Sequence, residues 1–130
     1  MKVAKEDIPA EIDSPPAIAR HQRDFGDASD YGDLAAEYFS LKQGTDITGL
    51  LEGLEDDHCQ SPHWGYVISG EVAVTYTDGS EEVVKGGDMY YWPPGHTVRA
   101  EKDTDVVMFS PQHEHGEVIE HMRNKMEESA

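Results

Sequence analysis

The stretch EVAVTYTDGSEEVV, residues 71–84, decides the class of fold. Its first half alternates: Val72, Val74 and Tyr76 lie on one face of an extended chain, and a mostly polar set lies on the other. The dipeptide DG at 78–79 follows, and it favours a tight hairpin turn because both residue types tolerate positive φ angles. We therefore predict a β-hairpin with one apolar face turned to a core.

Short apolar runs separated by turn residues continue on both sides of this hairpin. The other extended segments that we predict cover residues 34–41, 45–54, 63–70, 88–92, 97–100 and 103–110. Turn signals recur about every 8 to 12 residues, which is typical of all-β sandwiches and barrels. No rhythm of strands alternating with helices is present, so a parallel α/β fold is not expected. Alternation alone leaves a sandwich, a closed barrel and a jelly roll as alternatives.

The two ends of the chain differ from this β-rich middle. Residues 1–33 are polar, with SPP at 14–16, and we predict an N-terminal arm with little regular structure beyond one short strand. Residues 34–112 would form the β domain. Residues 113–130 carry an apolar stripe with helical spacing, so we predict an amphipathic C-terminal helix that packs on the barrel or on a second subunit. The stripe consists of Val118, Ile119, Met122 and Met126.

Composition limits the partners of the protein. A chain of 130 residues suits one domain, and its net charge of -17 argues against binding to nucleic acid or to anionic membranes. The acidity indicates a solvated surface or an adaptation to high salt. The single cysteine excludes an internal disulfide, and no apolar signal segment or membrane-spanning run is present. We therefore expect a cytoplasmic protein.

A second stretch, GDMYYWPPG at residues 87–95, narrows the choice of fold. Its first and last glycines and its first proline fit the pattern G-x5-P-x-G without a gap, which opens the second sequence motif of the cupin superfamily. The middle of the chain thus resembles the cupins, which fold as a double-stranded β-helix, or jelly-roll barrel. The fold that we predict is all-β, a cupin-type barrel followed by a short C-terminal helix.

In that family the two motifs supply three histidines and one glutamate to a metal ion, and this chain keeps those positions only in part. The histidine position of the second motif falls on Val98, but His96 lies two residues earlier and would share its strand face. The first motif reads G-x5-H-x-H-x(3,4)-E-x6-G. Its glutamate position falls on His63, and its second histidine position falls on His58 or Cys59, depending on the spacer.

The chain also resembles a subgroup of small single-domain cupins. The shared features are C-x2-PH-x-GYV-x-SG at residues 59–70, the hairpin that begins at 78, and PPGH at 93–96. The resemblance covers about half of the chain, residues 59–110. It implies the fold, and it brings no established reaction.

The resemblance and the residue types together indicate a metal site. His63 and His96 would converge at the mouth of the barrel, joined by His58 or Cys59, which face opposite ways in an extended chain. Imidazole and thiolate bind borderline divalent ions, so zinc, iron, copper, manganese and nickel are candidates. The alternatives are a strand-capping His63, a surface turn histidine at 96, and a small buried residue at Cys59.

Other side chains are given lesser roles. The residues expected to line a substrate pocket are Tyr66, Tyr90, Trp92 and Val98. His113 and His115 precede the terminal helix, so we expect them in a solvated linker, while His21 and His121 carry no signal.

Three functions fit this sequence: a metal-dependent enzyme acting on a small organic molecule, a non-catalytic sensor or carrier of a small molecule or metal, and a structural dimerisation module. The missing glutamate and the displaced histidine argue against a standard four-ligand oxygenase. In each case we expect a homodimer, because cupin sheets leave apolar faces and edges to cover. The N-terminal arm and the stripe at Met122 and Met126 are candidates to cover them.

Overall fold

The computed structural model describes residues 1–26, 30 and 32–128. Residues 27–29 and 31 of the predicted arm, and 129–130 of the predicted helical end, lie outside the described residues. The elements in chain order are the 3-10 helix η1 (Lys5–Asp7), strands β1 (Ala10–Ser14), β2 (Ala17–Gln22) and β3 (Leu34–Leu41), the 3-10 helices η2 (Thr48–Leu51) and η3 (Glu55–Asp57), strands β4 (His63–Ser69), β5 (Glu71–Tyr76), β6 (Glu81–Lys85), β7 (Met89–Trp92), β8 (His96–Ala100) and β9 (Thr104–Pro111), and helix α1 (Gln112–Glu128).

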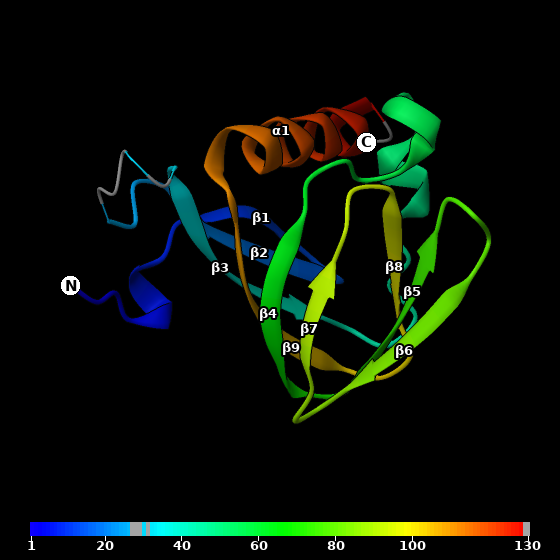
Figure 1. The fold of residues 1–130 in the computed structure, drawn as a ribbon, viewed down its shortest axis with the longest axis horizontal. Coiled ribbons are helices and arrows are strands. Elements are labelled where there is room, and N and C mark those ends of the chain that lie inside the picture. Colours follow the sequence, from blue (N-terminus) through cyan, green and yellow to red (C-terminus); the bar gives the residue numbers. More distant parts are fainter. Residues whose placement is uncertain (27–29, 31, 129–130) are drawn as a thin grey trace.

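The strands form two antiparallel sheets. The larger sheet has the order β1-β2-β3-β9-β4-β7, and the smaller has the order β6-β5-β8. Figure 1 shows the two sheets beside each other, with α1 lying across the end at which β4 and β8 begin. This arrangement confirms the predicted β-rich class with a C-terminal helix.

The hairpin at residues 71–84 forms as predicted. β5 pairs with β6 so that Val72 lies opposite Val84, and Gly79 in the connecting turn has a φ of +86°, a conformation that glycine adopts without strain. Val72 and Val74 are fully buried, as the alternation requires. On its other edge β5 pairs with β8, which brings the segment after the proline-glycine turn into the core.

The prediction of a mostly irregular N-terminal arm is wrong. β1 and β2 form a hairpin, and β2 extends the larger sheet by pairing along β3. The prolines at 15 and 16 suggest a break in regular structure, but they occupy the turn between the two strands, where no ladder hydrogen bond is lost. Alternate residues of β2, Ala19 and His21, are buried against the rest of the molecule.

The strand predicted over residues 45–54 is also wrong. The segment makes the 3-10 helix η2, and its apolar side chains turn toward α1 instead of lying along a sheet. Leu51 is fully buried there, in a cluster with Val118, Ile119 and Met122. The stripe of the C-terminal helix therefore packs within its own chain. None of the helices in the described part of the chain is long and apolar enough to cross a membrane.

We expect Gly65→Ala to destabilise the fold. A methyl group at this position in β4 would overlap the carbonyl oxygen of Val107 and the hydroxyl of Tyr90, which donates a hydrogen bond to that same carbonyl. Forcing such a group into a packed position costs about 1–3 kcal/mol of the free energy of unfolding. Urea unfolding would measure it, with Gly49→Ala as the control because nothing lies near a methyl there. Equal stability of the two variants would contradict the expectation.

Candidate metal and ligand site

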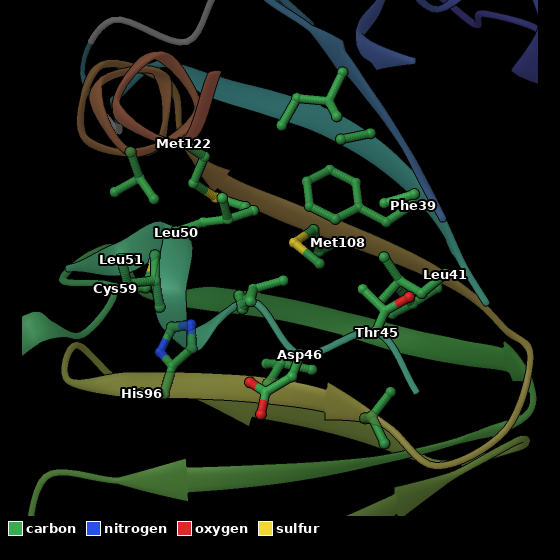
Figure 2. Close-up of a pocket in the computed structure, with 18 of the residues that line it drawn as sticks. Phe39, Leu41, Thr45, Asp46, Leu50, Leu51, Cys59, His96, Met108 and Met122 are labelled. Atoms are coloured by element: carbon green, nitrogen blue, oxygen red, sulfur yellow. The ribbon is translucent and has the colours of Figure 1, made fainter. Parts of the chain in front are cut away.

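A cavity of about 380 Å³ lies between the two sheets and beneath α1. Both sheets, η2 and α1 contribute side chains to its wall, and most of these are apolar. Figure 2 shows Cys59 and His96 at one end of the cavity, Phe39 and Met108 along it, and Leu41 toward the other end.

Three candidate ligands meet at the histidine end of this cavity. His63 is the first residue of β4, and His96 is the first residue of β8. Cys59 lies in the loop before β4, where its backbone N–H donates to the carbonyl of His96 and its own carbonyl accepts from the N–H of Gly95, each at 2.8 Å. These bonds clamp the cysteine loop against the start of β8 and bring together residues nearly 40 positions apart in the sequence.

The donor atoms of this trio, Cys59, His63 and His96, all lie within 4.8 Å of one another. The sulfur of Cys59 is 3.6 Å from Nε2 of His63, and the rings of His63 and His96 have centroids 4.9 Å apart. All three side chains are buried. A buried cluster of two imidazoles and a thiol is a donor set that a borderline metal ion prefers.

In both His63 and His96 the Nδ1 atom is engaged in a hydrogen bond, so Nε2 is the nitrogen left available to the cluster. Nδ1 of His96 donates to the carbonyl of Pro93 at 2.7 Å, so its Nε2 carries a lone pair. Nδ1 of His63 lies 2.6 Å from the hydroxyl of Ser110, which can accept the same kind of bond. Metal-ligating histidines are commonly oriented in this way by a partner on the second nitrogen.

Burial keeps the cluster uncharged in the absence of an ion. It lowers the pKa of His63 well below its ordinary value, and neighbouring His115 and His96 lower it further. It lowers the pKa of His96 to about 4, opposed by the bond to Pro93. It raises the pKa of the Cys59 thiol to about 12, opposed by the backbone of Ser61. Neutral imidazole is the form that ligates metal, and a bound cation would promote loss of the thiol proton.

The depressed pKa of His96 makes the stability of the metal-free protein depend on pH. At pH values between 6.5, the ordinary pKa of histidine, and about 4, His96 is protonated in the unfolded chain but stays neutral in the folded one. The stabilisation is therefore fully present above pH 6.5 and falls as the pH drops toward 4, by roughly 3 kcal/mol. Urea unfolding between pH 7 and 4 should give a shallower slope for His96→Gln than for the wild type. Parallel slopes would mean that another group controls the loss.

A second group of donors contains His63 as well. Donor atoms of Glu37, His63 and His115 lie within 4.8 Å of one another, and all three residues are buried. Nδ1 of His115, at the start of α1, makes a short hydrogen bond to the Glu37 carboxylate, and its ring centroid lies 4.2 Å from that of His63. Nε2 of His21 lies 3.9 Å from Glu37, because these two residues face each other across β2 and β3.

The sequence prediction for His115 is therefore wrong. It is buried and lines the cavity, because α1 starts directly after β9 and turns back over the end of the sheets. His21, to which the sequence assigns nothing, is buried too. A signal for Glu37 was available: in residues 34–41 it alternates with Ala35 and Phe39, so a carboxylate sits on an otherwise apolar strand face.

The other predicted site residues lie in different places. His58 is half-buried beside Cys59, but its Nδ1 lies 2.6 Å from the carbonyl of Asp56, and it belongs to neither donor group among the described residues. Trp92 and Val98, two of the residues expected to line a substrate pocket, line the cavity. Tyr66 is exposed on the outer sheet face, and Tyr90 is buried with its hydroxyl bonded to a backbone carbonyl, so neither lines this cavity.

Comparison with known proteins identifies the family. A family model described as a cupin domain matches residues 41–118, more than half of the chain. The chain belongs to the cupin family. A search among proteins of curated function finds no match.

Solved structures of other cupin-like proteins share the fold. Ectoine synthase from P. lautus superimposes with a TM-score of 0.59 at 18% identity, over 86% of this chain and 78% of that one. Oxalate decarboxylase from Bacillus subtilis gives 0.57 at 20% identity, over 82% of this chain but 28% of the larger enzyme. KdgF from Halomonas sp. gives 0.53 at 21% identity, over 83% and 92% of the two chains. At such low identities the structural similarity establishes only the fold of this cupin. Its chemistry has to be inferred from the residues of its own cavity.

Proposed function

We propose that this cupin binds one divalent metal ion through His63, His96 and Cys59, and that it holds a small organic molecule in the adjoining cavity. The observation that carries the proposal is the convergence of these three buried donors at one end of the cavity. We infer further that the two sheets form the jelly-roll barrel of the family, with the ion in its interior.

The donor set fits such an ion on its chemistry. Two nitrogens and one sulfur suit zinc, copper or iron better than manganese, which prefers oxygen ligands. With only three ligands from the protein, a position would remain open for water or for an oxygen of the bound molecule. A metal ion in that setting supplies Lewis-acid polarisation of the oxygen, which is the basis for proposing a metal-dependent reaction on a small substrate.

Metal analysis of protein purified without an affinity tag tests this function. About one equivalent of a transition metal should copurify, or should be taken up from zinc or cobalt salts after treatment with a chelator. Cobalt offers an independent readout, because a thiolate ligand gives a charge-transfer band that Cys59→Ser should remove. The same band in His58→Ala should persist, since His58 lies outside the donor trio. If the wild type takes up none of the candidate metals, the proposal is wrong.

We also propose that the protein is a homodimer, through a surface different from those the sequence suggests. The N-terminal residues and the helix stripe are both used within the chain. Apolar side chains are instead exposed on the outer face of β4, β7 and β9. This outer face consists of Trp64, Tyr66, Ile68, Met89, Tyr91 and Phe109. Cross-strand pairing makes it continuous, with the rings of Trp64 and Tyr91 stacked at 5.3 Å.

Light scattering on a sizing column tests the dimer. The wild type should have the mass of two chains, and Trp64→Glu combined with Tyr91→Glu should have the mass of one, because two charges would be buried without partners in the contact. Val83→Glu is the matched control, since Val83 is an exposed apolar residue of the smaller sheet. A wild-type monomer at both low and high salt would contradict the dimer.

A further inference from the structure

We propose that the molecule bound in the cavity is an amphiphile: an unbranched alkyl or arylalkyl body carrying a single metal-binding oxygen group. This inference rests on the proposed metal site and adds the chemical class of the ligand. It follows from the distribution of polar and apolar side chains along the cavity.

The wall beyond the histidine end is mostly apolar, and its polar members are Ser14, Thr45 and Asp46. From the larger sheet and η2, the side chains of Phe39, Leu41, Met108 and Leu50 face the cavity, and Met122 of α1 covers it from above. Figure 2 shows Phe39 and Met108 along the middle of the space, with Asp46 between His96 and Thr45 on the side of β8. Such a surface gains from burying a hydrocarbon and offers few hydrogen-bond partners to a polar ligand.

The charges around the cavity argue against a second anionic group on the ligand. Among the described residues that line it, none is lysine or arginine. The one lining carboxylate, Asp46, is exposed at the rim and already accepts hydrogen bonds from Thr48. The chain as a whole carries a net charge of -17. An anionic tail would therefore be buried without a cation and would meet a negative rim, whereas an anionic head could be neutralised by the metal.

The direction and size of the ligand follow from the same geometry. Its head would sit at His63 and His96, and its body would pass Phe39 and Met108 toward the exposed rim at Thr45. A space of 380 Å³ equals the liquid volume of about a dozen water molecules, and so takes about a dozen non-hydrogen atoms. With the head group counted, this corresponds to an alkyl body of about eight carbons.

A series of straight-chain alkyl hydroxamic acids, from acetohydroxamic to decanohydroxamic acid, tests the proposal on the zinc-loaded protein. The hydroxamate supplies the same chelating head throughout, so calorimetry would isolate the effect of the body. Affinity should rise about fourfold per added methylene, the equivalent of about 0.8 kcal/mol for each CH2 buried, until the cavity is full. A chain of equal length ending in a carboxylate should bind no better than acetohydroxamic acid.

Variants locate the body of the probe. Leu41→Trp should fill the distal part of the cavity and move the plateau to shorter chains, while binding of acetohydroxamic acid stays unchanged. Thr45→Trp at the rim should do the same and is the safer substitution, because Thr45 is only half-buried. Leu34→Trp is the matched control, as Leu34 lies on β3 at an exposed position that does not line the cavity.

The outcomes separate this inference from the proposed function. If the wild type binds no zinc, the proposed metal site fails, and matching alkyl amides, which carry no chelating head, then test the apolar cavity alone. Rising affinity with amide length would uphold the apolar body. If zinc and acetohydroxamic acid bind but affinity is independent of chain length, or if the carboxylate-ended probe binds as tightly as the alkyl one, the ligand is not of this class.

Discussion

Replacing both His63 and His96 with alanine is expected to abolish stoichiometric metal binding without unfolding the protein. The two imidazoles supply the nitrogen donors of the proposed trio, and Cys59 alone offers a thiol whose pKa burial raises to about 12. A single buried thiol of that kind would not hold an ion against solvent, so affinity should drop by at least about 100-fold. Metal content by mass spectrometry and circular dichroism would be measured on the same preparations.

The control for this double variant is His113→Ala. His113 is exposed on α1 and pairs only with Glu117 among the contacts described for it, so its loss removes a histidine without touching the cavity. Wild type and control should each retain about one equivalent of metal. If the double variant still copurifies with one equivalent, the histidines at 63 and 96 are ligand-contacting or structural residues, and the site must be sought elsewhere.

Replacing Glu37 with glutamine is expected to weaken metal binding about 10- to 100-fold, the usual cost of losing an outer partner of a metal site. Glu37 is fully buried, its carboxylate accepts from Nδ1 of His115, and its oxygens lie within reach of the His63 donor group. A buried negative charge at this distance offsets the charge of the ion, and it holds His115 with its other nitrogen free. Glutamine keeps the shape and an oxygen that can accept from His115, but it removes the charge and weakens that hydrogen bond.

A zinc competition assay with a chelating dye would measure the change, and His115→Ala should weaken binding in the same range. Glu114→Gln serves as the control, because it removes a carboxylate from an exposed position of the same first helical turn. Affinities of Glu37→Gln and His115→Ala within twofold of the wild type would show that this pair belongs to the core packing and takes no part in the site.

The local features of this fold follow from neighbouring residues. The hairpin at 71–84 depends on an alternation and a turn dipeptide, which act over a few positions, and Val72 and Val74 are buried as the pattern requires. The same holds for the helix at Gln112–Glu128, whose stripe is a local period. The turn at 93–95 likewise leads into the strand predicted over 97–100, which forms as His96–Ala100.

The errors arise where tertiary packing outweighs local preference. Residues 45–54 contain enough apolar side chains for a strand, but Leu51 finds its partners on α1, so the segment coils under the helix. The polar composition and the prolines of residues 1–33 predict an irregular arm. The edge of β3, however, has backbone N–H and C=O groups with which β2 pairs. Neither partner can be seen from the segment itself.

The sequence by itself indicated Cys59, His63 and His96 as candidate donors and predicted the strands at the two histidines, because motif spacing and alternation are local properties. Only the tertiary structure decided which residues meet. Cys59 reaches His96 through a backbone clamp, while His58 next to it turns to its own loop. Glu37 and His115, which are 78 positions apart, form a buried pair against His63 because β3 and β9 are neighbours in one sheet and α1 folds back over its end. Such convergence depends on long-range strand pairing and on the burial of a helix, and no short stretch of sequence encodes either.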